Sequence, residues 1–224
     1  PQRLQQDLDT VIRRFRSAPQ VGAYHDGSWK GISLRSVDGD YRNSLAHSYG
    51  VCHDTEVLEH TPYIEEILAS FKFKVGVARL LFLPPGKKIG EHTDSGHGWH
   101  LGLARLHIPI VTHENVIMMI DGERCQWREG EFWFGDFRLP HWLHNQSEIT
   151  RVHLVIDCFV DEELLKLFPQ EAVDAINATT DIFLNTPQDS NTQTHSINAY
   201  FKLASGFLPL YGRIISEREI LKIN

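Results

Sequence analysis

Apolar residues recur along the chain with two different periods, and each period predicts one kind of element. Residues 1–16 carry apolar positions three and four apart, so that one helical face is hydrophobic. That face consists of Leu4, Leu8, Val11, Ile12 and Phe15. Residues 61–71 have a similar spacing, with Thr61 at the expected N-cap and Pro62 at the first helical position, where its missing N–H costs nothing. Both segments are predicted to be helices.

From about residue 74 to residue 160 the pattern changes to short apolar or alternating runs separated by turn residues such as Asp121-Gly122. The runs are 74–83, 103–111, 115–120, 124–136, 141–145 and 150–160. Several short strands at this spacing predict an antiparallel sandwich or barrel.

Helical patterns return after the strands. Residues 161–168 and 170–177 are predicted to be helices, and the polar segment 185–196 a loop. The apolar positions of 201–214 and 216–223 predict two more helices that cover the barrel.

No internal repeat and no linker divides the chain. We therefore expect one domain over residues 1–224. Its β-barrel core should span about 74–160, and a helical jacket should be formed by 1–73 and 161–224.

Composition narrows the class of protein. The chain is 42% hydrophobic and 23% charged, as in ordinary globular proteins. A formal net charge of −7 argues against binding of nucleic acid or of an anionic membrane surface. No apolar run approaches the ~20 residues that a membrane span needs. We expect a small molecule as the partner, and a monomer or homodimer.

The cysteines indicate a reducing environment. Cys52, Cys125 and Cys158 are odd in number and far apart, which favours free thiols over a disulfide framework. The start of the sequence has no signal-peptide pattern. Together these features predict a cytoplasmic protein.

A group of metal-binding residue types follows the first strand of the predicted barrel. In the segment EHTDSGHGWH, His92 and Asp94 are two residues apart, so that in an extended chain both side chains reach one ion. A later strand offers His141 or His144 as a third ligand. Two histidines and one carboxylate on one face are typical of non-haem Fe(II) oxygenases. The alternative is a polar loop that is rich in histidine by chance.

Two strands repeat a pattern of arginine, apolar residue and histidine. Arg105 and His107 share one face of the first strand, as Arg151 and His153 share one face of the second. Because burial of an unpaired arginine is costly, the pattern suggests a buried anionic partner. The alternative is that Arg151 pairs with Asp136 or Asp157 of the protein itself.

These segments resemble the aspartyl/asparaginyl β-hydroxylase family of Fe(II)- and 2-oxoglutarate-dependent oxygenases, which includes bacterial hydroxylases of free proline. The resemblance lies in ARLLFLPPGKKIGEHTD, LARLHIPI, WREGEFWFGDFRLPHWLHN and TRVHLVIDCF, over roughly residues 76–160. A weaker resemblance covers YHDGSWKGISLRS at 24–36. The resemblance to this family implies a mainly β fold, a double-stranded β-helix (jelly roll or cupin-like barrel) with flanking N- and C-terminal helices.

The resemblance also implies roles for individual residues. His92, Asp94 and His141 match the catalytic Fe(II) ligands, whereas His144 lies outside the family register. Arg151 matches the residue that binds the distal carboxylate of 2-oxoglutarate. The residues expected near that co-substrate are Arg105, His107 and His153.

The implied reaction is hydroxylation of an unactivated C–H bond with O2 and 2-oxoglutarate. Because Asp94 is present, no ligand position is left open for halide, which disfavours halogenation. The implied substrate is amino-acid-like or a natural-product intermediate. Alternatives are hydroxylation of Asp or Asn side chains in a peptide, a cupin-like metal protein without oxygenase activity, and a non-catalytic interaction domain.

Residues that could meet the substrate lie in two regions. In the early strand segment, Arg35 could bind a substrate carboxylate, although a surface salt bridge explains it equally well. The loop after His92 and Asp94 could act as a lid over the site. The full set of candidates is Arg35, Tyr24, Trp29, Trp99, His100 and Arg138.

Overall fold

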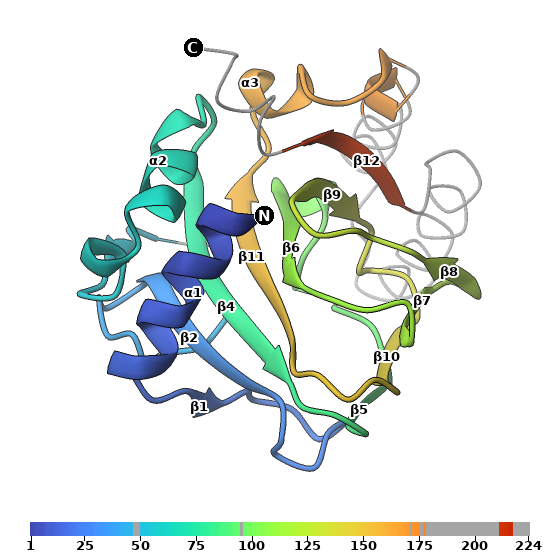
Figure 1. The fold of residues 1–224 in the computed structure, drawn as a ribbon. Coiled ribbons are helices and arrows are strands. Elements are labelled where there is room, and N and C mark those ends of the chain that lie inside the picture. Colours follow the sequence, from blue (N-terminus) through green and yellow to red (C-terminus); the bar gives the residue numbers. More distant parts are fainter. Residues whose placement is uncertain (47–49, 95, 171, 175–176, 178–210, 217–224) are drawn as a thin grey trace.

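The computed structural model describes residues 1–46, 50–94, 96–170, 172–174, 177 and 211–216, and its centre is a pair of antiparallel sheets (Figure 1). The predicted loop at 185–196 and most of the three predicted helices after residue 169 lie outside the described residues. No helix in the described part of the chain is long and apolar enough to cross a membrane.

The larger sheet has the strand order β1-β2-β4-β11-β6-β9-β12, with β3 paired to β2. The smaller sheet has the order β5-β10-β7-β8. Larger-sheet strands are β1 (Ala18–Pro19), β2 (Lys30–Ser36), β3 (His53–Asp54), β4 (Val75–Leu83), β6 (Leu103–Val111), β9 (Glu131–Gly135), β11 (Arg151–Phe159) and β12 (Tyr211–Ser216). Smaller-sheet strands are β5 (Lys88–His92), β7 (Val116–Ile120), β8 (Glu123–Cys125) and β10 (His141–Asn145).

The eight strands from β4 to β11 are distributed between the sheets as in a jelly roll. From β4 in the larger sheet the chain crosses to β5, returns at β6, and crosses again to β7 and β8; it then alternates through β9, β10 and β11. Within each sheet, strands distant in sequence become neighbours, such as β4 with β11 and β5 with β10. This arrangement confirms the expected double-stranded β-helix.

Helices cover the outer face of the larger sheet. Figure 1 shows α1 (Gln2–Arg14) crossing that sheet, with α2 (Pro62–Ser70) beside it. The helical residues Leu4, Leu8 and Ile64 belong to the same buried cluster as the sheet residues Leu80 and Leu106. Short helices in the described part of the chain are η1 (Leu58–His60), η2 (Trp99–Leu101) and α3 (Glu162–Leu165), and residues 172–174 are helical as well.

A second, smaller hydrophobic cluster lies between the two sheets. Its members are Leu83, Ile89, Met118, Ile120, Cys125, Trp127, Phe137, Leu139 and Leu143. Most of the hydrophobic core is thus outside the barrel, between sheet and helices. The barrel interior is left with room for polar side chains.

The predicted helical jacket is only partly correct. The segment before the barrel contributes β1, β2 and β3 to the larger sheet. The helix predicted over 201–214 is wrong at its end, because Tyr211–Ser216 is the strand β12 and pairs with β9. Tyrosine and two isoleucines favour an extended chain, and β9 offers a free sheet edge for pairing.

The N-terminus of α2 is capped from another helix. Thr61 is the N-cap residue as predicted, but its side chain makes no capping bond and donates to the carbonyls of Val57 and Leu58 instead. The carboxylate of Asp7, on α1, accepts hydrogen bonds from the backbone N–H groups of Tyr63 at 2.9 Å and Ile64 at 2.8 Å. A buried charge on α1 therefore joins the two helices.

Replacing Asp7 should destabilise the fold. In Asp7→Ala two backbone N–H groups lose their acceptor, and we expect the free energy of unfolding to fall by about 1–2 kcal/mol. Urea denaturation measures this change. Asp9→Ala, at an exposed position of the same helix, should change it by less than about 0.5 kcal/mol. Equal effects of the two substitutions would contradict the capping role.

Candidate functional site

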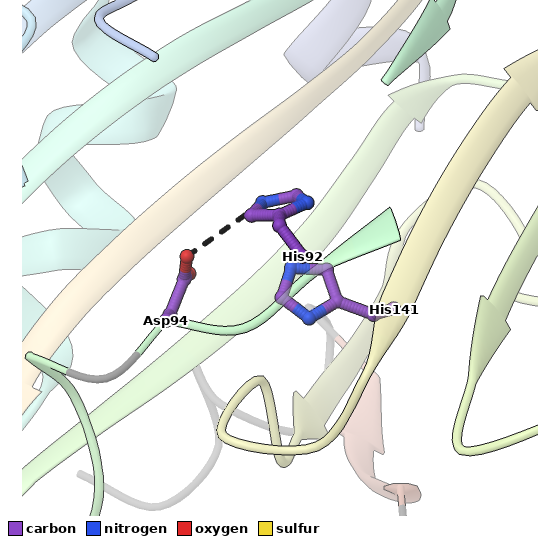
Figure 2. A group of neighbouring side chains, drawn as sticks. All are labelled: His92, Asp94 and His141. Carbon is purple, nitrogen blue, oxygen red and sulfur yellow. Dashed lines mark ion pairs between the residues drawn. The ribbon is translucent and has the colours of Figure 1, made fainter. Parts of the chain in front are cut away.

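The two histidines and the aspartate of the predicted metal site come together at one end of the smaller sheet. His92 is the last residue of β5, and His141, the first residue of β10, pairs with it in the antiparallel register. Asp94 follows β5 and is held by its N–H, which donates to the carbonyl of Phe137 at 2.8 Å. One possible ligand atom from each of the three lies within 4.8 Å of the others. Figure 2 shows the three side chains gathered around one point.

Hydrogen bonds set the orientation of both imidazole rings. The Nδ1 atom of His92 is 2.8 Å from the carbonyl oxygen of Gly90, and that of His141 is 2.9 Å from the carbonyl oxygen of Leu139. Because a carbonyl only accepts, both Nδ1 atoms carry a hydrogen, so that in the neutral ring the free lone pair is on Nε2. Burial also lowers the pKa of His141 to about 4, so its ring is neutral at pH 7. Nε2 is therefore the atom of each ring that could bind a metal ion.

Aromatic contacts hold these rings in place. The ring of Tyr24 stacks on that of His92 with centroids 3.8 Å apart and planes 12° apart. Phe137 contacts His141 edge-on at 4.9 Å. Packing on both sides restricts rotation of the two imidazoles.

Asp94 is ionised at neutral pH. Burial by itself would raise the pKa of its carboxyl, but the charge of Arg105, with smaller effects of the nearby histidines, outweighs burial and lowers that pKa. Arg105 and Asp94 form an ion pair. The carboxylate oxygen Oδ1 of Asp94 is 3.7 Å from Nε2 of His92. The group thus offers two imidazole nitrogens and one anionic oxygen, a donor set that suits Fe(II) or Zn(II).

A completely buried carboxylate, that of Asp157 on β11, organises the arginines beside this group. Its Oδ1 accepts from Nε of Arg105 at 2.6 Å, and its Oδ2 accepts from Nη2 of Arg79 at 2.9 Å. The two positive charges outweigh the effect of burial and hold the pKa of Asp157 well below its usual range. Arg105 therefore has two protein carboxylates as partners and is not an unpaired cation.

Arg151 differs from the other arginines of the barrel interior. It is the first residue of β11 and is 3% exposed, yet no carboxylate of the described residues lies within 4.0 Å of its nitrogens. Its Nη2 donates to Nδ1 of His153 at 2.7 Å, and its Nε has no hydrogen-bond partner within the described part of the chain. Burial lowers the pKa of its guanidinium to about 9, which still leaves it charged at pH 7. The structure excludes pairing with Asp136, which binds Arg138, or with Asp157.

His153 and His107 extend the chain of polar contacts that begins at Arg151. Because arginine only donates, Nδ1 of His153 accepts the hydrogen bond from Arg151. The Nδ1 atom of His107 is 3.3 Å from the same Nδ1 atom of His153, so a hydrogen bond between the two rings requires the hydrogen to be on His107. Nε2 of His107 is buried and finds no hydrogen-bond partner among the residues that the structure describes. Burial lowers the pKa of both histidines well below the usual value, so both are neutral.

One cavity of about 310 Å³ contains most of these groups. It is lined by His92, Asp94, His141, Arg105, His107 and Arg151, and by the predicted substrate-contact residues Tyr24 and Trp29. Arg151 and His153 also line a second cavity, of about 630 Å³.

Other residues that were predicted to contact the substrate do not line this cavity. Arg35 forms an ion pair with Asp54 and donates to the carbonyl of Cys52 at 2.9 Å, which matches the salt-bridge alternative. Trp99 is buried in the outer core, stacked near Phe134, and is not part of the cavity wall.

Arg138 also lies away from the cavity. It is buried and holds Asp136 through two bonds, of 2.8 and 2.6 Å. His144 is half-exposed and does not line the cavity. The side chain of His100 lies outside what the structure describes.

Sequence reasoning missed two charged residues of the cavity region. Arg79 lines the cavity and Asp157 joins it to Arg105. The signal was present: Arg79 lies within the apolar run VARLLFL and Asp157 within LVIDCF, and a charge inside a buried strand needs a partner.

Comparison with known proteins agrees with this geometry. Residues 2–160 match the aspartyl/asparaginyl beta-hydroxylase family. An L-proline cis-4-hydroxylase from Rhizobium meliloti (strain 1021) is 26% identical over 163 residues, which make up 69% of this chain and 56% of that protein. An ornithine lipid ester-linked acyl 2-hydroxylase from Rhizobium tropici is 30% identical over 71 residues, 30% of this chain and 25% of that protein. The chain thus spans about half, or less, of these relatives.

Among solved structures, a cupin 2 conserved barrel domain protein from Salinispora arenicola CNS-205 has a TM-score of 0.29 and 16% identity, over 40% of this chain and 66% of that one. The family match is more extensive: it covers well over half of the chain and contains the His92, Asp94 and His141 group together with Arg151. Both curated relatives are hydroxylases. The protein belongs to the aspartyl/asparaginyl β-hydroxylase family.

Proposed function

We propose that this protein is an Fe(II)- and 2-oxoglutarate-dependent dioxygenase that hydroxylates an unactivated C–H bond of a small, amino-acid-like substrate. One observation carries the proposal: a group of two histidines and one carboxylate shares a cavity with a buried arginine that has no acidic partner among the described residues. The first feature suits Fe(II), and the second suits a dianionic co-substrate. Membership of a hydroxylase family supports the same reaction class.

His92, Asp94 and His141 would hold the iron. Three protein ligands leave further coordination positions for exchangeable ligands, as an oxygenase requires. When bound, iron and 2-oxoglutarate supply the oxidation, in which dioxygen converts 2-oxoglutarate to succinate and carbon dioxide while one oxygen atom enters the substrate. The protein would hold the iron in position, because ring contacts and Nδ1 hydrogen bonds fix the orientation of the two imidazoles whose Nε2 atoms would bind it.

Arg151 would bind the distal carboxylate of 2-oxoglutarate. Its unpartnered Nε and its position on the cavity wall fit an acceptor that arrives with a ligand. His153 takes one N–H of Nη2, which limits rotation of the guanidinium. A planar guanidinium can bind both oxygens of a carboxylate, and the low polarity around it strengthens that pair.

The charges around the cavity support an acidic substrate. Arg79 and Arg105 pair with the two carboxylates of Asp94 and Asp157, and Arg151 adds a third positive charge, so one positive charge is in excess. Bound Fe(II) and the 2-oxoglutarate dianion cancel each other and leave this excess unchanged. A substrate with a carboxylate would balance it, whereas a cation would increase it. An amino acid with an acidic side chain, or an acid without a free ammonium group, fits this requirement.

The metal ligands can be tested by replacing one histidine at a time. His141→Ala should weaken Fe(II) binding by more than about 100-fold, since loss of even an outer-shell partner typically costs 10- to 100-fold. His144→Ala should leave it unchanged, because that side chain lies on the same strand but outside the group. Anaerobic titration with Fe(II) measures both. Loss of binding in His144→Ala with retention in His141→Ala would reverse the assignment.

Arg151 can be tested through the affinity for 2-oxoglutarate. Arg151→Lys keeps the charge but loses the planar pair of donors, and we expect the dissociation constant for 2-oxoglutarate to rise about 10- to 100-fold. Iron affinity, measured on the same preparation, should stay within about threefold of the unmodified protein, because Arg151 does not contact the ligands. Unchanged 2-oxoglutarate binding in this variant would refute the role.

The reaction outcome follows from the presence of Asp94. A substrate is sought by succinate release from Fe(II)-loaded protein with a panel of amino acids and related acids. With labelled dioxygen and excess chloride, mass spectrometry should find one labelled oxygen atom in the product, or a desaturated product without label, and no chlorine. Asp94→Gly should weaken iron binding and leave Arg105 with one carboxylate partner fewer. A chlorinated product from the unmodified protein would contradict this reading of Asp94.

A further inference from the structure

Part of the exposed edge of the cavity is apolar. The large hydrophobic residues of the described chain that remain exposed are Ile12, Val21, Leu45, Val51 and Ile149. Two of them, Val21 at 67% and Leu45 at 41% exposure, line the cavity that holds the His92, Asp94 and His141 group. We call Val21 and Leu45 the rim. The half-buried side chains of Ala46 and Trp142 also line this cavity.

The rim is held in place by a buried charge of the cavity. Nη1 of Arg79 donates to the side-chain oxygen of Gln20 at 3.3 Å and to the backbone carbonyl of Ser44 at 2.9 Å. These two acceptors directly precede Val21 and Leu45 in the chain. The hydroxyl of Ser44 also donates to the carbonyl of Pro19 at 3.3 Å and so joins the two segments.

The segment that follows Val21 is fixed to the barrel as well. The carbonyl of Tyr24 accepts from the N–H of Gly90 at 2.7 Å, and its ring stacks on His92. Gly22 lies against that ring so closely that a Cβ at this position would be 2.6 Å from Cζ of Tyr24. The rim is therefore an ordered part of the cavity wall. The residues before it bind Arg79, which also pairs with Asp157.

The cavity is thus divided by polarity. Its buried wall carries Arg79, Arg105 and Arg151, and its exposed edge carries the rim. Exposed aliphatic side chains gain free energy when a ligand covers them, in proportion to the apolar area removed from water. A polar substrate such as a free acidic amino acid would leave the rim in water. A substrate with an aliphatic part would cover it.

We propose that the rim binds an aliphatic chain of the substrate, so that the substrate is a carboxylic acid carrying a chain of several carbon atoms that extends from the buried arginines to the exposed edge of the cavity. This inference rests on the proposed function, which places the reacting carbon in the same cavity. It narrows the substrate class from amino-acid-like compounds in general to acids with an apolar extension. Val21 and Leu45 are then specificity-determining residues that do not touch the metal ligands.

The experiment has two stages, which separate this inference from the proposed function. The protein is first loaded with Mn(II) without oxygen and titrated calorimetrically with 2-oxoglutarate; lack of binding here would overturn the proposed function, and the inference with it. The loaded protein is then titrated with N-acetyl-, N-butanoyl-, N-hexanoyl- and N-octanoylglycine. We expect the affinity to increase about two- to fourfold for each added methylene until the chain passes the rim.

Matched variants show whether the rim causes the increase. Val21→Ser combined with Leu45→Ser should make the affinity nearly independent of chain length, while 2-oxoglutarate binding stays unchanged. Val51→Ser, which removes an equally exposed apolar residue that does not line the cavity, should keep the full dependence. If 2-oxoglutarate binds but the series is flat, if no acylglycine binds, or if the rim variant keeps the dependence, the inference is wrong.

Discussion

The Asp157 carboxylate, buried between Arg79 and Arg105, is the interaction on which the rest of the cavity depends. Removing two arginines from water would be prohibitive without a fixed counter-charge, and a lone buried carboxylate would be equally costly. The trio satisfies both requirements within three neighbouring strands, β4, β11 and β6. Each arginine then has donors left over, which Arg105 gives to Asp94 and Arg79 gives to the segments before the rim.

This arrangement explains why the barrel interior can be polar. The main hydrophobic core lies on the other face of the larger sheet, beneath α1 and α2, so the stability of the fold does not require an apolar interior. Burial between sheet and helices provides the hydrophobic free energy, and the interior is free for charges. Arg151 is the one arginine of this interior whose described surroundings offer no carboxylate, which marks it as the place for an external anion.

Local patterns were sufficient to predict most strands of the barrel and the neighbourhood of His92 and Asp94, because alternation in a strand and a two-residue spacing are properties of a short segment. Partners across strands were not predictable in the same way. The pairing of Arg105 with Asp157 depends on the register between β6 and β11, which places the two residues opposite each other although they are 52 residues apart. The cap of α2 by Asp7 is likewise a contact between distant segments. The strand β12 was missed because the apolar spacing before it also fits a helix, and only the free edge of β9 decides between the two.

The hydrogen bonds of the two histidines have a consequence for the protein before it meets any metal. In both, Nδ1 bonds to the backbone carbonyl two residues earlier in the same chain segment, so each tautomer is chosen by its own local backbone. The pairing of His92 with His141 then brings together two rings whose tautomers are set by the fold and not by the metal. The histidines of such a site need no change of tautomer when an ion arrives. The folded barrel thus acts as a receptor whose ring orientations exist in advance of its ion.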